Sequence, residues 1–182
     1  MSKLLKTIKL KATEPALISE ASDVLTGYID SDFKNYGLDK DTPAEEKTVE
    51  LYKMIENGIF KQIFTQPEKQ WMTQGQVIEF VKNHKEDLKT SYGYTFFLLK
   101  KNGVFFVAFA YLDGHGRPGV YVRRFDYDFV WGPEFGSQFV VLQLDSKTPS
   151  SETSESLTLG SLDSRIKELE NQVESLRKFL VF

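Results

Sequence analysis

The chain has 182 residues, of which 41% are hydrophobic, 14% aromatic and 27% charged, and its formal net charge is -3. At this length one main domain can bury a sizeable core without metal or disulfide support. The absence of cysteine excludes disulfides, zinc–thiolate sites, iron–sulfur clusters and thiol nucleophiles. The sequence holds no apolar run of about 18 residues that could span a bilayer, and its first residues lack a secretion-signal pattern. We therefore expect a cytoplasmic protein without membrane contacts.

Charged and aromatic residues are unevenly distributed along the chain. Residues 1–12 carry four lysines and no acid, whereas residues 13–50 carry ten acids and three lysines. No segment is strongly basic overall, which disfavours a broad phosphate-binding face. Fifteen of the 25 aromatic residues fall between Tyr92 and Phe139. We expect this stretch to be the structural centre.

The first half of the chain contains four periodic segments. Residues 7–11 alternate apolar and charged side chains, which predicts a short strand at a sheet edge. Residues 15–29 have apolar side chains at helical spacing. The run Thr42-Pro43-Ala44-Glu45 is typical of a helix start, and we expect that helix to continue to about residue 59. A third helix is expected over residues 73–90, with Thr73 and Gln76 forming a capping box.

The second half of the domain has the pattern of a sheet. Asn102-Gly103 separates two extended apolar segments, which predicts a β-hairpin over residues 94–112. The segment VFFVAFAYL (104–112) is apolar on both faces, so we expect a central strand that is covered on both sides. Further strands are expected at residues 120–125, 127–131 and 138–144.

The predicted fold class is α+β, with three N-terminal helices packed on an antiparallel sheet of about five strands and a C-terminal coiled-coil helix. Residues 1–145 would form the globular domain. Residues 146–158 are rich in Ser and Thr and are expected to be a flexible linker. Residues 159–182 would form the oligomerisation helix.

The C-terminal segment has an unbroken heptad pattern. Its a and d positions are Leu159, Leu162, Ile166, Leu169, Val173, Leu176 and Leu180. Apolar residues confined to these two positions over three heptads predict a self-associating coiled coil. The alternative is a single amphipathic helix that folds back on the domain, although such a helix usually has a wider apolar stripe.

Two features bear on the number of chains in this coil. Ile166 and Val173 at a positions, with leucine at d, favour a parallel dimer. In contrast, the run from Arg165 to Glu170 resembles the short Arg-h-x-x-h-Glu motif of small trimeric coiled coils, in which the arginine pairs with the glutamate of a neighbour. We favour a homotrimer and keep the dimer as the alternative. In either state, linked copies of a weak binding site would bind a multivalent partner more tightly than one copy.

The sequence contains no recognisable catalytic, nucleotide-binding or metal-binding motif. We therefore predict no catalytic residues, no cofactor and no metal. His84 is expected to be a solvated side chain of the third helix. Asp126 and Asp128 are two residues apart and could hold a hard cation, but solvent-facing charges on a strand explain them more simply.

Seven residues are candidate contacts for a ligand or a nucleic acid. They are Lys100, Lys101, Asp113, His115, Arg117, Arg123 and Arg124. The loop at 113–119 combines an acid, an imidazole and a guanidinium, which permits an anion, metal or enzymatic site. Basic and aromatic residues on a sheet also suit single-stranded nucleic acid, but the acidic segment 13–50 would repel phosphates.

These features together predict a non-enzymatic, oligomeric binding or assembly protein. Its domain would present the sheet face or the 113–119 loop to a macromolecular partner, and we favour a protein over a nucleic acid. The apolar strand at 104–112 also permits domains of neighbouring chains to pack through their sheets. Nucleic-acid binding and an enzyme with a carboxylate and histidine site near the loop are the alternatives.

Overall fold

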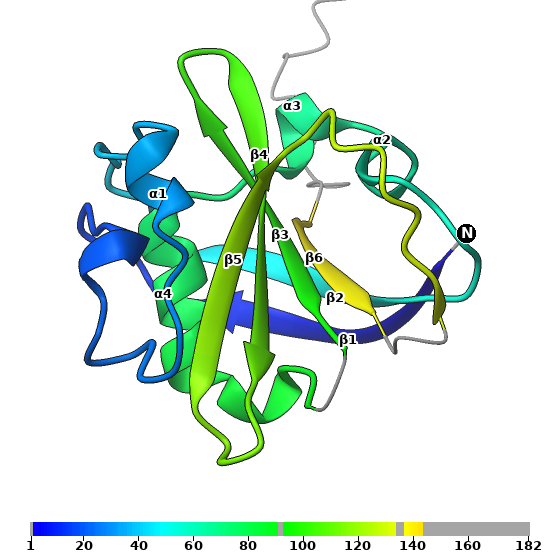
Figure 1. Ribbon diagram of the computed structural model, residues 1–182, viewed down its shortest axis with the longest axis horizontal. Coiled ribbons are helices and arrows are strands. Elements are labelled where there is room, and N and C mark those ends of the chain that lie inside the picture. The colour runs from blue at the N-terminus through cyan, green and yellow to red at the C-terminus, as the bar shows by residue number, and fades with distance from the viewer. Residues whose placement is uncertain (1, 91–92, 134–136, 144–182) are drawn as a thin grey trace, which may run out of the picture. The chain divides into compact units, whose positions relative to one another are not determined.

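A six-stranded sheet organises the structure (Figure 1). A cluster of buried side chains covers each of its faces. The computed structural model describes residues 2–90, 93–133 and 137–143, which belong to one unit, Met1–Leu144. The strands are β1 (Ser2–Leu10), β2 (Lys47–Met54), β3 (Thr95–Lys101), β4 (Val104–Leu112), β5 (Pro118–Arg124) and β6 (Gln138–Leu142). Their order in the sheet is β1-β2-β6-β3-β4-β5. The sheet is mixed because β6 runs parallel to β3, whereas all other neighbours are antiparallel.

The helices of the described residues are short. The α-helices are α1 (Asp32–Asn35), α2 (Phe60–Ile63), α3 (Pro67–Gln70) and α4 (Gln74–Asn83), and two 3₁₀ turns are η1 (Ile18–Glu20) and η2 (Lys85–Asp87). Only α4 is longer than four residues in this part of the chain. Within the described ranges no helix is long and apolar enough to cross a membrane.

The predicted fold class was therefore wrong for the helices and for the sheet. Three helices do not pack on the sheet in the described part of the chain, and the sheet is mixed with six strands. The sheet is mixed because β6 inserts between β2 and β3 and pairs in parallel with β3. Such an insertion depends on tertiary pairing, which periodicity along the chain does not encode.

The predicted helix at residues 42–59 is mostly strand β2. Val49 and Leu51 point to one face of the sheet, and Met54 points to the other. An apolar set at these positions satisfies the alternation of a strand as well as the spacing of a helix. Pairing with β1 on one side and β6 on the other selects the strand.

The predicted helix at residues 15–29 was also wrong. Only the 3₁₀ turn η1 forms there, and the segment that follows runs beside β5. The backbone N–H of Ile18 donates to Oε1 of Gln74, 3.1 Å away, so this segment is tied to α4 by a side chain. The predicted strand at 127–131 is likewise an irregular segment that joins the rest of the structure through a bridge between Gly58 and Trp131.

Three local predictions are confirmed, although the helix predicted over residues 73–90 ends at Asn83. Helix α4 begins after Thr73, whose hydroxyl accepts from the N–H of Gln76 while Oε1 of Gln76 accepts from the N–H of Thr73. The hairpin of β3 and β4 turns at Asn102 and Gly103, which have φ angles of 51° and 78°. Residues 7–10 belong to the edge strand β1.

Each face of the sheet has its own apolar core, as predicted for the two-sided strand β4. One core lies under α4, α1 and η1 and includes Phe33, Phe80, Phe97 and Ala108. The other lies under α2 and the segment before Pro133, and it includes Phe60, Phe96, Phe109 and Trp131. Figure 1 shows α4 and α1 on one side of the sheet and α2 on the other.

Several predictions fall on residues 144–182, which lie outside the described residues. They are the linker at 146–158 and the coiled coil at 159–182, with its pairing of Arg165 and Glu170.

Candidate functional site

The seven predicted contact residues lie at two opposite ends of the sheet. Lys100 and Lys101 end β3, and Arg123 and Arg124 end β5, on either side of the first residues of β4. The loop 113–117 joins β4 to β5 at the other end of these strands. The structure therefore does not bring all seven residues into one site.

Each of the five basic candidates is paired with a carboxylate. The pairs are Lys100 with Glu68, Lys101 with Asp39, Arg117 with Asp113, Arg123 with Asp30 and Asp32, and Arg124 with Asp126. A nucleic-acid backbone would have to displace an acid at each position before it could bind. This arrangement favours a neutral partner over one that binds through phosphate groups.

Asp113 organises the loop between β4 and β5. Its Oδ1 accepts from the backbone N–H groups of His115 and Arg117, both at 2.9 Å, and its Oδ2 accepts from Nε of Arg117 at 2.8 Å. The hydrogen bonds from Arg117, together with that from His115, lower the pKa of Asp113 to about 2. The imidazole of His115 is exposed beside this turn. The geometry supports a structural role for the carboxylate, as in an Asx turn.

A buried acid lies at the outer edge of β5. Asp30 is only 6% exposed, and its Oδ2 lies 2.9 Å from NH1 of Arg123. The preceding backbone then runs along β5, where the N–H of Val120 donates to the carbonyl of Tyr28 at 2.7 Å. Asp30 and Arg123 are 93 residues apart in sequence, so sequence patterns could not reveal the pair.

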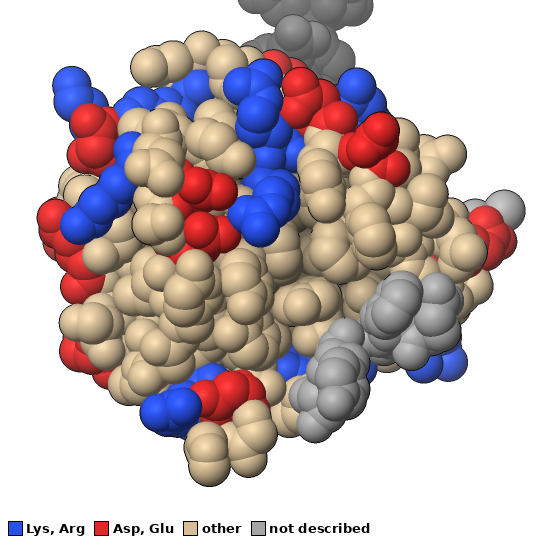
Figure 2. Space-filling view, in the orientation of Figure 1, with Lys and Arg blue, Asp and Glu red and all other residues tan. Residues whose placement is uncertain are grey.

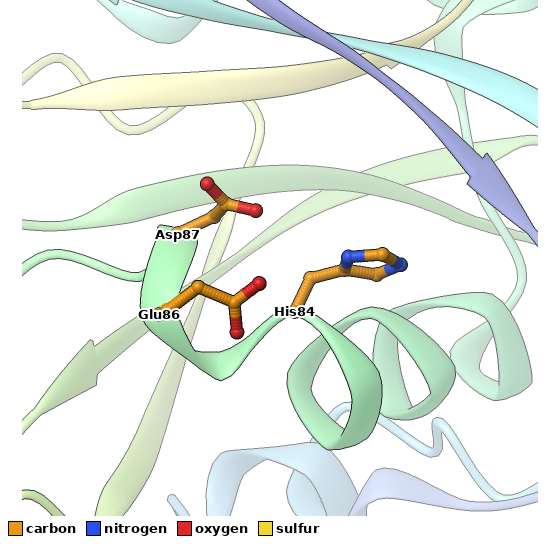
Figure 3. A group of neighbouring side chains, drawn as sticks. All are labelled: His84, Glu86 and Asp87. Atoms are coloured by element: carbon orange, nitrogen blue, oxygen red, sulfur yellow. The ribbon is translucent and has the colours of Figure 1, made fainter.

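His84, Glu86 and Asp87 form a cluster at the end of α4 (Figure 3). One ligand atom from each lies within 4.8 Å of the others. This corner attracts cations because a helix C-terminus carries partial negative charge. Lys6 of β1 already supplies a positive charge, with its Nζ 2.6 Å from Oδ2 of Asp87, and that hydrogen bond raises the pKa of Lys6. The cluster therefore ties β1 to η2.

A groove of about 360 Å³ lies beside Trp71. Its walls are the loop 38–42, the segment 71–74 and the end of the β3–β4 hairpin. Two ion pairs, Lys100 with Glu68 and Lys101 with Asp39, involve residues of this region. Asp41, on the groove wall, accepts from the N–H groups of Gln74 and Gly75 at the start of α4. Most charged groups of the groove therefore already form ion pairs or hydrogen bonds within the domain.

Seven aromatic rings form a continuous chain of contacts that reaches the surface at both ends, whereas Trp131 within it is a core residue and only 8% exposed. In order they are Tyr28, Tyr121, Tyr111, Tyr94, Trp131, Phe129 and Tyr127, and we call this set the aromatic row. Consecutive ring centroids lie 4.8–6.2 Å apart. The rings toward both ends are the most exposed, with Tyr28 at 46% at one end and Phe129 and Tyr127 at 45% and 41% at the other. Figure 2 shows a broad area without charged side chains over β5, between charged groups at either end of the strand.

Gly119 makes room for the middle of the aromatic row. A Cβ atom at this position would lie 2.7–2.9 Å from three atoms of the Tyr111 side chain. Tyr111 faces Gly119 across the β4–β5 pair, so its ring lies over the glycine and stacks beside Tyr121 at 5.5 Å. The glycine is needed here for close approach of a ring, rather than for an unusual backbone angle.

Two tyrosines in the middle of the row have raised pKa values. Burial raises the pKa of Tyr94 above its usual value. Burial and a hydrogen bond with Tyr121 also raise the pKa of Tyr111. The row therefore offers apolar ring faces and neutral hydroxyl groups to a partner.

Sequence reasoning located only part of this surface. The aromatic density after Tyr92 indicated the region, and Tyr111 and Tyr121 lie on β4 and β5 as the strand pattern predicts. Tyr28 could not be found in this way, because it lies in the acidic segment that was assigned to a helix. Comparison of the chain with family models, curated proteins and solved structures found no match.

Proposed function

We propose that this protein is a non-enzymatic, oligomeric binding protein that holds a protein partner on its aromatic row. The observation that supports this proposal is the chain of rings itself, whose exposed ends lie beside the ion pairs Arg117–Asp113 and Arg124–Asp126. Rings of Tyr and Trp are common anchors of protein interfaces because they combine large apolar area with a polar tip.

The C-terminal heptads complete the proposal. Two or three linked copies of one weak surface would bind a multivalent partner about 10²–10⁴ times more tightly than a single copy. The heptad pattern of residues 159–182 supports such linkage. A protein partner is favoured over a nucleic acid because the candidate lysines and arginines already pair with acids.

The test is capture of partners by the full chain from its native source. Three baits are compared: the natural chain, the row variant Tyr28→Ser with Phe129→Ser, and the control variant Leu4→Ser with Val104→Ser. The control residues are 46% and 42% exposed, which matches the row residues, but they lie on β1 and at the start of β4.

We expect a defined protein that the natural chain and the control capture and the row variant loses. Capture should persist after nuclease treatment and change little between about 50 and about 200 mM salt, because phosphate contacts would weaken steeply over that range. Equal capture by all three baits, or capture that nuclease abolishes, would contradict the proposal.

A further inference from the structure

We propose that Asn102 is a site of non-enzymatic modification, at which deamidation converts a neutral amide on the wall of the groove beside Trp71 into a carboxylate. The chain contains two Asn-Gly pairs, Asn57-Gly58 and Asn102-Gly103. The structure holds the two pairs differently, and only the second is free to react. Neither pair belongs to the aromatic row, so the site is independent of the proposed function.

The reaction takes place within the chain and needs only water. The backbone nitrogen of the glycine attacks Cγ of the asparagine, and the new C–N bond closes a succinimide ring. The bond from Cγ to the side-chain nitrogen breaks, and that nitrogen leaves as ammonia with the proton of the backbone amide. Water then opens the ring at either carbonyl, which leaves an aspartyl or an isoaspartyl residue. Glycine favours the attack because it has no Cβ and its backbone rotates easily.

Gly58 is held away from this reaction. It is buried, its N–H donates to the carbonyl of Trp131 at 2.8 Å, and its carbonyl accepts from the N–H of Trp131 at 2.9 Å. Its nitrogen could turn toward Cγ of Asn57 only if these hydrogen bonds broke. We therefore expect Asn57 to remain an amide while the chain is folded.

Gly103 has no comparable restraint. It lies at the exposed tip of the β3–β4 hairpin, beyond the pair formed by Lys101 and Val104. Among the described residues, neither the N–H of Gly103 nor the side chain of Asn102 has a hydrogen-bond partner. A Cβ atom at Gly103 would meet nothing within 4 Å, so no neighbour blocks movement of the turn. Only the turn itself must open, and exposed tips open locally at a small cost in free energy.

The modification would change both the groove and the hairpin. Asn102 lines the groove together with Lys40, Lys100 and Lys101, so the product adds a negative charge beside three lysines. Aspartate followed by glycine also suits a primed turn, so the hairpin would persist with that product. Isoaspartate adds a backbone atom to the turn, which would no longer join Lys101 and Val104 in their observed pairing.

The experiment incubates the full chain at mildly alkaline pH in water enriched in the heavy isotope of oxygen. Opening of the ring then labels the new carboxyl group. Digestion with pepsin at acid pH stops the reaction, and mass spectrometry of the peptides measures conversion at each Asn-Gly pair over time. Asn57 is the matched internal control. A second incubation in concentrated urea measures both pairs in the unfolded chain.

In the folded chain we expect Asn102 to convert at least about tenfold faster than Asn57, because two backbone hydrogen bonds of Gly58 must break first. In urea the two rates should become similar, because both pairs then have the same free Asn-Gly chemistry. Asn102→Gln should remove the acidic form of the folded chain that accumulates on ion-exchange chromatography.

Equal rates at the two pairs in the folded chain, or faster conversion of Asn57, would overturn the inference. Label at both pairs in urea but none at Asn102 in the folded chain would show that the turn protects Asn102, and this result would overturn it as well.

Discussion

Gly119 is the residue on which the geometry of the aromatic row depends most directly. The ring of Tyr111 occupies the space that any larger residue at 119 would need, and Tyr94 and Tyr121 restrict where that ring can move. Because the side chain of glycine is a single hydrogen atom, position 119 leaves room for three tyrosines to lie side by side.

Replacement of Gly119 by alanine should destabilise the protein by about 1–3 kcal/mol, as overpacking does in a filled site. The measurement is urea unfolding of the full chain. Gly114→Ala is the matched control, because a Cβ there meets nothing within 4 Å, and it should be nearly neutral. Equal stabilities for the two variants would show that Tyr111 does not need the space over residue 119.

At the same scale, the carboxylate of Asp113 makes the hydrogen bonds of the loop between β4 and β5 depend on pH. Hydrogen bonds from Arg117 and His115 lower the pKa of Asp113 to about 2, below the usual value of about 3.9. For a group with a lowered folded-state pKa, the stabilisation is fully present above the unfolded value and is lost as the pH falls.

We therefore expect the loop to keep its hydrogen bonds down to about pH 4 and to lose them as the pH falls through about 2. A carboxyl carbon NMR titration of Asp113 measures this midpoint directly. A midpoint near 4 would show that the carboxylate is free of Arg117 in solution.

At the scale of elements, local signals and tertiary pairing contribute differently to the fold. The start of α4 and the turn at Asn102 depend on side chains and backbone angles within a few residues, so they are predictable. β2 depends on its neighbours β1 and β6, and its apolar spacing is compatible with either helix or strand. The edge contact of Tyr28 with β5 is equally long-range, which is why one end of the row was missed.

Thr73 and Thr42 both resemble helix caps in the sequence. Their replacement distinguishes a local signal that forms a helix from one that tertiary pairing overrides. Thr73→Ala should cost about 1 kcal/mol, because the N–H of Gln76 at the start of α4 loses its acceptor. Thr42→Ala should change the stability by less than about 0.5 kcal/mol, because Thr42 is exposed and no helix begins beside it. Urea unfolding measures both. Equal losses would mean that Thr42 also caps a helix.

At the scale of the whole molecule, the proposal combines one neutral surface with several copies of the chain. The sheet positions the rings, ion pairs engage the basic residues near them, and the heptads at 159–182 would link the copies. Neither part alone explains a strong and selective interaction, because an isolated row of exposed rings binds weakly.

Linkage through the heptads predicts a multiple of the 20.9 kDa chain mass in light scattering, with three copies favoured over two. Ile166→Asp with Leu169→Asp should reduce the mass to that of one chain, because both residues occupy seam positions. Lys167→Asp with Asn171→Asp changes outward positions and should leave the mass unchanged. A single-chain mass for the natural protein would contradict the linkage.

Photo-crosslinking in the native host tests most directly whether the aromatic row is the binding surface. A benzoylphenylalanine residue replaces Phe129 in one chain and Val104, which is similarly exposed but outside the row, in another. Our account predicts that position 129 crosslinks to a second protein and that position 104 does not. Crosslinks from position 104 alone, or crosslinks from position 129 to nucleic acid, would contradict it.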